Sequence, residues 1–426
     1  MDRKDLLLLL LVYRRRTRRA REASRRRRRK WVRTIFQRRR EHGDYHNLLA
    51  EMRLQDAESH YRFLRMSRET FDALVAKVAP ALKRRSYQSV YRPEISPGER
   101  LALTLRYLAT GNSQVSVSFS FRVGRATVCH IIRETCAALW QVLQPEYVKG
   151  PSSEEDWKGI AREFSKLWNF PNCVGAIDGK HISIQAPASS GSSYYNYKGG
   201  HSVVLMAVCD AHYRFIFVDI GNSGRHSDGG VLSNSEFGRA LDAGKLGLPS
   251  PTTLPGTAIE VPFAFVGDEA FPLQRNMLRP YPGRNLADPE AVFNYRLSRS
   301  RRVIENSFGI LAARWRLFRR PIIASPDHVV LFTQAAIALH NYLRTTESTV
   351  YCPRGFSDAE DGAGNVTEGA WRSEVDGDNG LSRIGSVGSN MYSRSAATCR
   401  DTIRDYFMSS EGEVTWQYHH IHRTEY

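Results

Sequence analysis

Apolar residues recur at helical spacing through residues 46–150, and this pattern predicts a helical region. The spacing and the turn residues indicate helices at 71–82, 100–110, 115–121 and 125–140. The start of the second helix carries cap chemistry, with Ser96 as N-cap, Pro97 at the first helical position and Glu99 at the third. Gly111 follows the last periodic residue of that helix, where a glycine commonly ends a helix.

After residue 170 the pattern changes to short continuous apolar runs, which are typical of buried strands. These runs lie at 173–177, 203–208, 215–220 and 263–267. Two long helical patterns follow, at 292–318 and 327–343, before the chain becomes polar. Strands followed by a further strand and helices predict an α/β core over residues 160–345.

A turn containing Gly124 precedes the last helix of the N-terminal region, and three helices with such a turn are typical of a helix-turn-helix. In this interpretation Arg125, Thr127 and His130 lie on the exposed start of a recognition helix and contact DNA. The alternative is an ordinary helical bundle. In that case the apolar residues of the same helix form its core, and both interpretations can hold together.

Charge is concentrated at the start of the chain, where residues 1–40 hold 18 of the Lys and Arg residues against 3 acidic ones. The net charge of the whole chain is +17, so the remainder is close to neutral. We therefore expect a disordered basic arm over residues 1–45, which serves nuclear import and phosphate contact, or alternatively only solubility. Nuclear localisation follows from the first function, with the cytoplasm as the alternative.

The C-terminal part is rich in Gly, Ser, Asp and Glu, which predicts a disordered acidic linker over residues 346–395. A short helix and a tail are expected over residues 396–426. No apolar run approaches the roughly 18 residues that a membrane helix needs. The six cysteines are widely dispersed, which favours reduced intracellular thiols over a disulfide framework.

Three acidic residues stand at positions where carboxylates can perform chemistry. Asp178 follows the run 173–177, and Asp268 follows the run 263–267, so both are expected at strand ends. Glu305 flanks the apolar stripe of the helix at 292–318. Each has a simple structural explanation by itself, as a turn cap or as an ion pair with Arg301. Together they match the oxygen ligands that Mg²⁺ or Mn²⁺ use in two-metal phosphodiester hydrolysis.

Four sequence blocks resemble, in the same order, those of the PIF/Harbinger-type DDE transposases and their domesticated nuclease relatives. They are AIDGKHI at 176–182, YNYKGGHS at 195–202, GDEAFPL at 267–273 and RVIENSFGIL at 302–311. The resemblance implies a ribonuclease-H-like DDE nuclease core, preceded by the all-α helix-turn-helix-like domain of residues 46–150. It places Asp178, Asp268 and Glu305 on the catalytic triad and makes them metal ligands.

The same resemblance implies a further metal ligand and several partners. Asp228 falls on a fourth acidic position of the family and becomes an additional metal ligand, with a helix N-cap as the alternative. The implied partners are DNA and a separate Myb-like DNA-binding protein, and self-association into a homo-oligomer is left open. No membrane partner is expected.

Basic side chains surround the expected triad. Arg301 and Arg302 belong to the segment 296–320, whose net charge of +7 predicts phosphate binding or, alternatively, a solvated helix face. Lys198 lies in an aromatic and basic stretch that could stack on DNA or clamp it. His340 and Asn341 follow an apolar run and are expected to be a polar pair within the core.

Three functions follow from these patterns. The first is a DNA nuclease that depends on a divalent cation and hydrolyses phosphodiester bonds. The second is a domesticated DNA-binding protein whose DDE site is inactive, and the third is an RNA-directed nuclease of the same fold.

Overall fold

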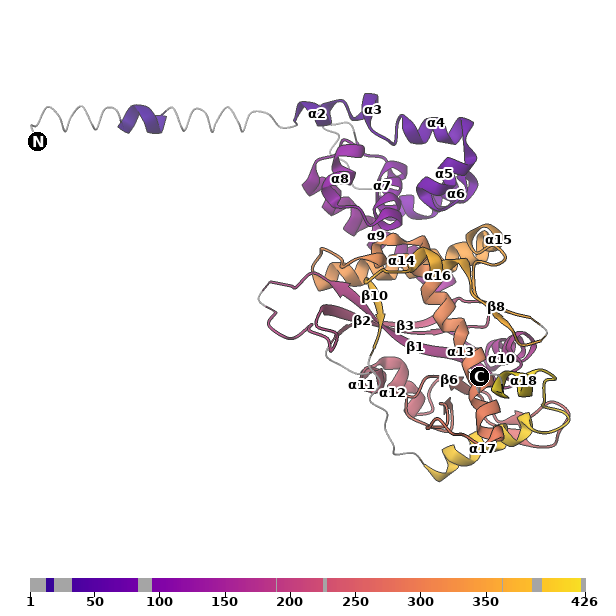
Figure 1. Cartoon of the computed structure of the whole chain (residues 1–426). Coiled ribbons are helices and arrows are strands. Elements are labelled where there is room, and N and C mark those ends of the chain that lie inside the picture. The colour runs from indigo at the N-terminus through magenta and orange to yellow at the C-terminus, as the bar shows by residue number, and fades with distance from the viewer. Residues whose placement is uncertain are drawn as a thin grey trace, which may run out of the picture.

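The computed structural model describes residues 13–18, 33–82, 94–188, 190–224, 228–361, 363–384 and 393–422. A set of helices forms one end of the molecule, a mixed sheet lies in the middle, and the C-terminal helices lie at the opposite end (Figure 1). The basic run Arg25–Lys30 and the apolar run Leu6–Val12 lie outside the described residues.

The N-terminal helices confirm the predicted pattern with shifts of a few residues. They are α2 (Thr34–Gln37), α3 (Arg39–His42), α4 (Leu48–Gln55), α5 (Ala57–Leu64), α6 (Arg68–Leu82), α7 (Pro97–Thr110), α8 (Gln114–Ser120) and α9 (Arg125–Tyr147). The hydroxyl of Ser96 accepts a hydrogen bond from the Glu99 amide, as the cap chemistry predicts. Gly111 adopts a φ of 64° at the end of α7, a conformation that glycine reaches without steric cost.

Residues 33–45 include the helices α2 and α3, which differs from the disordered segment expected over residues 1–45. Arg39 of α3 is buried and forms an ion pair with the buried carboxylate of Glu99. A buried carboxylate needs a partner, so this contact holds the end of the arm against α7. The arm prediction is therefore wrong for residues 33–45.

Five strands form the main path of the sheet, in the order β3-β2-β1-β6-β7. They are β1 (Cys173–Ile184), β2 (His201–Cys209), β3 (Phe215–Ser223), β6 (Ala264–Val266) and β7 (Met277–Leu278). The first three strands pair antiparallel, whereas β6 is parallel to β1 and β7 is parallel to β6. The α/β class predicted from the sequence is confirmed.

Helices cover both faces of this sheet. They are α10 (Glu154–Trp168), α11 (Asp228–Asn234), α12 (Glu236–Asp242), α13 (Asp288–Arg314) and α14 (Pro326–Thr346), and the 3-10 helix η1 (Arg316–Arg319) follows α13 and packs on α7. Ala176 and Ile182 of β1 belong to the core shared with α13 and α14, whereas Ile177 belongs to a second core shared with α11 and α12. Burial on both faces explains why these strands read as continuous apolar runs. The Pro- and Gly-rich stretch 244–262 carries the hairpin β4 (Thr252–Thr253) and β5 (Glu260–Val261).

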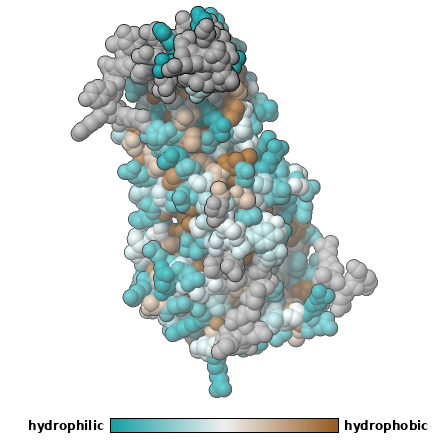
Figure 2. All heavy atoms as spheres, turned by 90° about the vertical axis from the view of Figure 1, so that its left-hand side faces the viewer, coloured by the Kyte–Doolittle hydropathy of each residue, from teal (hydrophilic) through white to brown (hydrophobic). Residues whose placement is uncertain are grey.

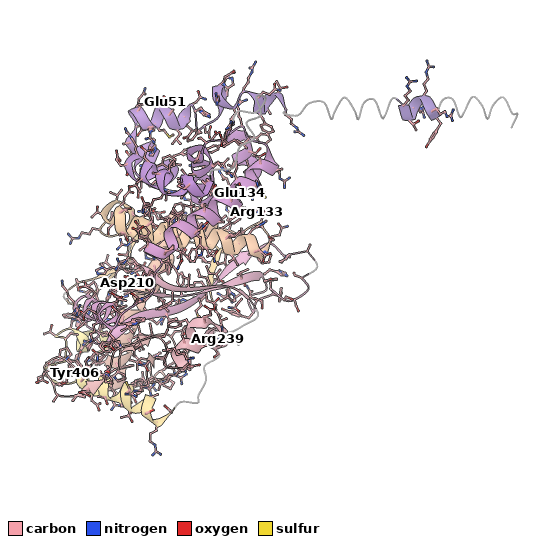
Figure 3. The ribbon with its side chains drawn as sticks, turned by 180° about the vertical axis from the view of Figure 1, so that it is seen from behind. Glu51, Arg133, Glu134, Asp210, Arg239 and Tyr406 are labelled. Atoms are coloured by element: carbon pink, nitrogen blue, oxygen red, sulfur yellow. The ribbon has the colours of Figure 1, made fainter. Side chains whose placement is uncertain are left out.

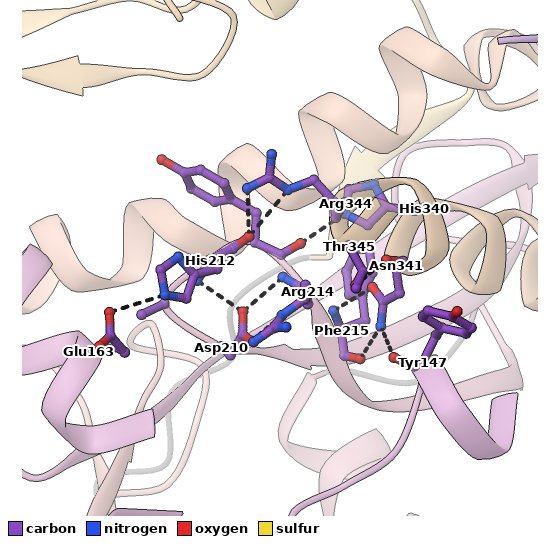
Figure 4. A network of polar contacts seen from close by, with 12 residues as sticks. Tyr147, Glu163, Asp210, His212, Arg214, Phe215, His340, Asn341, Arg344 and Thr345 are labelled. Carbon is purple, nitrogen blue, oxygen red and sulfur yellow. Dashed lines mark hydrogen bonds and ion pairs between the residues drawn. The ribbon is translucent and has the colours of Figure 1, made fainter. Parts of the chain in front are cut away.

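The helical region is joined to the sheet through α14, against which α9 packs. Figure 3 shows this junction from behind, with Arg133 and Glu134 on α9 beside α14. Asn341 of α14 donates to the carbonyls of Tyr147 and Phe215, at 2.7 Å each, and accepts from the Phe215 amide at 2.9 Å (Figure 4). This network crosses from α9 to β3, so the helical region and the sheet share one polar junction.

His340 lies beside Asn341, and both side chains are buried, as expected for a polar pair within the core. Its Nε2 atom lies 2.8 Å from the Tyr213 carbonyl, and burial lowers the pKa of His340 to about 3. The imidazole is therefore neutral at physiological pH and has a structural contact.

The C-terminal part differs from the disordered linker expected over residues 346–395, because secondary structure is present within residues 346–361 and 363–384 and packs on α13, α14 and β1. Its elements are α15 (Ser348–Tyr351), β8 (Ala359–Glu360), β9 (Val366–Thr367), α16 (Ala370–Val375) and β10 (Leu381–Arg383). Trp371 donates its indole N–H to Asn306 at 2.8 Å and lies against Gly309. The predicted C-terminal helix is present as α17 (Arg394–Phe407), and α18 (Gln417–His422) follows it.

Among the described residues, none of the helices combines the length and the apolar character that a bilayer crossing requires. Hydrophobic residues on the face drawn in Figure 2 form small patches between hydrophilic ones. All six cysteines are free thiols.

Candidate active site

Asp178 lies in the middle of β1 rather than at the end of a strand. The strand continues to Ile184 because β2 pairs with it along its whole second half, as far as Ile184 opposite His201. The Asp178 side chain is only 5% exposed. The predicted strand-end position is therefore wrong for Asp178 and correct for Asp268, which follows two residues after β6.

The parallel pairing of β1 and β6 brings the two aspartates together. Ala176 pairs with Val266, so Asp178 and Asp268 each lie two residues further along on neighbouring segments. Burial, and next the Asp178 carboxylate, raise the pKa of the Asp268 carboxyl. One Asp268 oxygen accepts a hydrogen bond from the Ala270 amide at 2.9 Å. The site thus contains two adjacent carboxylates whose repulsion a cation would relieve.

Glu305 reaches the same region from α13, which packs on β1. Its Oε1 atom accepts hydrogen bonds from Arg301 at 2.6 Å and from Arg383 of β10 at 3.0 Å. Arg301 also opposes the rise in the Asp268 pKa, so it lies within electrostatic reach of both acids. Glu305 and Asp268 thus share Arg301 as a basic neighbour, and the Glu305 carboxylate is engaged by two guanidinium groups.

Lys180 is a site residue that the sequence interpretation missed. Its Nζ atom lies 2.7 Å from Asp178 Oδ2 and 5.4 Å from the centroid of the Phe308 ring. Residues two apart on a strand share a face, and this spacing could have predicted the ion pair. Arg383 was missed as well, because no local pattern connects it with Glu305.

Asp228 is the first residue of α11, and the start of this helix borders the loop after β6. A Cβ atom added at Gly229 would lie 3.2 Å from the Ala270 carbonyl oxygen. The backbone of α11 is thus close to the Asp268 loop. The proposed role of Asp228 as a metal ligand stays a prediction.

The donor chemistry of Asp178 and Asp268 fits a hard divalent cation, which prefers carboxylate oxygens. Such a cation would activate a water molecule and stabilise the charge that develops on a phosphodiester. Among the described residues, however, no group of three His, Cys, Asp or Glu side chains is arranged to hold a metal ion. The Glu305 carboxylate is engaged instead by Arg301 and Arg383.

The predicted nucleic-acid contacts fall on two surfaces. Arg125, Thr127 and His130 are exposed at the start of α9, and His130 Nε2 lies 2.9 Å from Glu134 Oε1. Lys198 is exposed in the loop between β1 and β2, with its Nζ atom 5.5 Å from the Tyr197 ring centroid. These side chains stay candidates for contact with a phosphate backbone.

Arg302 has a different role from the predicted phosphate contact. It forms an ion pair with Glu360 at 2.8 Å, and Arg299 joins the same carboxylate at 3.1 Å. The Glu360 side chain is 2% exposed, so this pairing belongs to the interior. The net charge of +7 over residues 296–320 overstates the free positive charge, because acids from the C-terminal part neutralise some of it.

Comparison with known proteins agrees with the fold and the carboxylates. Residues 177–341 match the family model described as DDE superfamily endonuclease, and this segment contains Asp178, Asp268 and Glu305. Residues 177–341 are therefore similar to DDE superfamily endonuclease domains, and the mixed sheet fits a ribonuclease-H-like core.

Full-length relatives extend the similarity beyond this domain. The chain is 29% identical over 278 residues to "Protein ALP1-like" of Arabidopsis thaliana, which covers 62% of this chain and 64% of that protein. It is 24% identical over 310 residues to "Putative nuclease HARBI1" of Homo sapiens, which covers 70% of this chain and 82% of that protein. No solved structure matches. The resemblance to PIF/Harbinger-type DDE transposases and their domesticated derivatives is confirmed.

Proposed function

We propose that this protein is a transposase-derived DNA nuclease that hydrolyses phosphodiester bonds with a divalent cation, Mg²⁺ or Mn²⁺. The observation that carries the proposal is the pairing of Asp178 and Asp268 on neighbouring segments of the sheet, within an endonuclease domain. In this proposal Glu305 of α13 supplies the third carboxylate.

Each acidic residue of the candidate site has a distinct role in this proposal. Asp178 and Asp268 hold the cation, and Glu305 joins them when its guanidinium partners leave. Lys180 orients the Asp178 carboxylate through their ion pair. Asp228 is an additional ligand from the start of α11. A two-metal mechanism is the form of this chemistry that the family resemblance favours.

A nicking assay tests the proposal directly. The full chain is incubated with supercoiled plasmid DNA in the presence of Mg²⁺, Mn²⁺ or EDTA, and the open-circular product is quantified. We expect nicking with either cation and none with EDTA. Equal nicking in all three conditions, or none in any, would contradict the proposal.

DNA contact is assigned in this proposal to two surfaces and to the arm. The turn between α8 and α9 and the exposed start of α9 act as a helix-turn-helix through Arg125 and Thr127. Lys198 and its tyrosine neighbours contact DNA near the carboxylates. The basic arm adds phosphate contacts and directs the protein to the nucleus. A Myb-like partner protein and self-association belong to the same proposal through the family resemblance.

Removal of residues 1–40 is expected to weaken DNA binding and to reduce its salt dependence, because the deleted segment holds 18 basic residues. Each lost phosphate contact lowers the slope of log K against log salt by about 0.9. Fluorescence anisotropy at several salt concentrations measures the slope, and microscopy of a tagged chain measures nuclear accumulation. An unchanged slope together with unchanged nuclear signal would assign the arm another role.

A second function is favoured by a specific observation. Two carboxylates of the expected triad form ion pairs within the protein. Asp178 pairs with Lys180, and Glu305 pairs with Arg301 and Arg383. Such internal pairing suits a DNA-binding protein with an inactive DDE site. Plasmid binding without cation-dependent nicking would identify this function.

A further inference from the structure

The short strand β10 lies beside β1 next to the candidate site. It pairs antiparallel with β1, and Lys180, His181 and Ile182 stand opposite Arg383, Ser382 and Leu381. The strand β6 pairs only with the earlier half of β1, from Cys173 to Ala176. β10 therefore occupies the position beside β1 that opens directly after Asp178.

Several contacts fix β10 at this position. The Ser183 amide donates to the Gly380 carbonyl at 2.7 Å, and the Ser183 hydroxyl donates to the Asn379 carbonyl at 2.7 Å. The Tyr197 hydroxyl donates to the Arg383 carbonyl at 3.0 Å. Gly380 lies against the backbone of Phe318, where an added Cβ would lie 1.9 Å from the carbonyl oxygen. The strand thus connects the loop of Tyr197 with the carboxylate on α13.

Arg383 of β10 is the second arginine that pairs with the Glu305 carboxylate. Arg301, on the same helix, already donates to Glu305 Oε1 at 2.6 Å, and its side chain is 15% exposed. Arg383 donates to the same oxygen at 3.0 Å, but its side chain is 69% exposed. An ion pair this exposed contributes little to folding. Its placement on Glu305 is therefore explained better by the electrostatics of the site than by stability.

We propose that β10 is a built-in restraint on metal binding, in which Arg383 competes with a divalent cation for the Glu305 carboxylate. This inference rests on the proposed nuclease function and concerns the regulation of the same site. While β10 is docked, the Arg383 guanidinium pairs with Glu305, and a cation is bound mainly by Asp178 and Asp268. Release of Arg383 frees one side of Glu305 Oε1 and raises the affinity for the cation.

Calorimetric titration of the full chain with Mn²⁺, without DNA, tests this inference independently of cleavage. We expect Arg383→Ala to bind Mn²⁺ about two- to fivefold more tightly than the wild type, the range that an exposed ion pair can supply. Arg383→Lys keeps the positive charge and should stay close to the wild type. The matched control is Arg354→Ala, which removes an exposed arginine far along the sequence from β10 and should leave Mn²⁺ affinity unchanged.

A second variant displaces the strand without removing the charge. Gly380→Ala introduces a Cβ into the Phe318 backbone and should undock β10, so we expect the same gain in Mn²⁺ affinity as for Arg383→Ala. A gain in Arg383→Ala without a gain in Gly380→Ala would overturn the role of the strand.

The outcomes separate this inference from the proposed function. Equal Mn²⁺ affinity in the wild type and Arg383→Ala overturns the restraint. If Mn²⁺ binding by the wild type is nevertheless lost in Asp268→Asn, the proposed metal site stands. Absence of Mn²⁺ binding in the wild type and in every variant overturns both.

Discussion

An Asp268→Asn variant is expected to lose cation-dependent plasmid nicking by a factor on the order of 10²–10³ or more, because stabilisation of developing charge is usually the largest catalytic contribution. The substitution keeps the size of the side chain and its hydrogen bond with the Ala270 amide, while it removes one of the two adjacent carboxylates. Initial rates of open-circular product formation at matched Mg²⁺ concentration measure the loss.

DNA affinity of the same variant, measured in EDTA, should stay equal or rise slightly, since a negative charge that faces the phosphates has been removed. Asp327→Asn is the matched control, because Asp327 is exposed in the first turn of α14. It should nick DNA like the wild type. An Asp268→Asn variant that cuts as fast as the wild type would show that the triad assignment is wrong.

Glu360→Gln is expected to lower the free energy of unfolding by about 3–5 kcal/mol, the usual cost of removing one partner of a buried ion pair. Glu360 pairs with Arg299 and Arg302 at 3.1 and 2.8 Å, and all three side chains are at most 13% exposed. The variant leaves two nearly buried guanidinium groups without their carboxylate. Urea unfolding followed by circular dichroism measures the change.

Glu368→Gln serves as the control for this experiment, because Glu368 is exposed in the same part of the chain. Its effect should stay within about 0.5 kcal/mol, as for most surface substitutions. If Glu360→Gln were as mild as Glu368→Gln, residues 346–361 and 363–384 would not be docked on α13 as described. The measurement therefore tests the part of the fold that composition predicted to be disordered.

Elements whose signals are local could be predicted from the sequence. The start of α7 was predicted correctly because Ser96 caps the Glu99 amide only three residues away and Pro97 stands at the first helical position, whereas the Glu99 carboxylate pairs with the distant Arg39. The strand before Asp268 was predicted correctly because a short run of apolar residues ends just before that residue. These predictions need only neighbours along the chain.

Elements that depend on distant partners were predicted incorrectly or not at all. The single long strand β1 was not predicted, because Gly179, Lys180 and His181 interrupt the apolar pattern between Ile177 and Ile182, and pairing with β2 makes the two parts one strand. The C-terminal part was predicted as disordered because its composition is polar. A few side-chain contacts hold it in place, among them those of Glu360 and Trp371, whose partners lie about sixty residues earlier.

The sequence by itself indicated the resemblance to DDE endonucleases, the α/β class and the three candidate carboxylates, because these follow from residue types in a fixed order. Only the tertiary structure decided which charged side chains lie next to those carboxylates. It placed Asp178 beside Asp268 through strand register and brought Arg383 onto Glu305 through a strand 78 residues away. Coulomb interactions depend on distance in space, and a sequence pattern does not contain that distance.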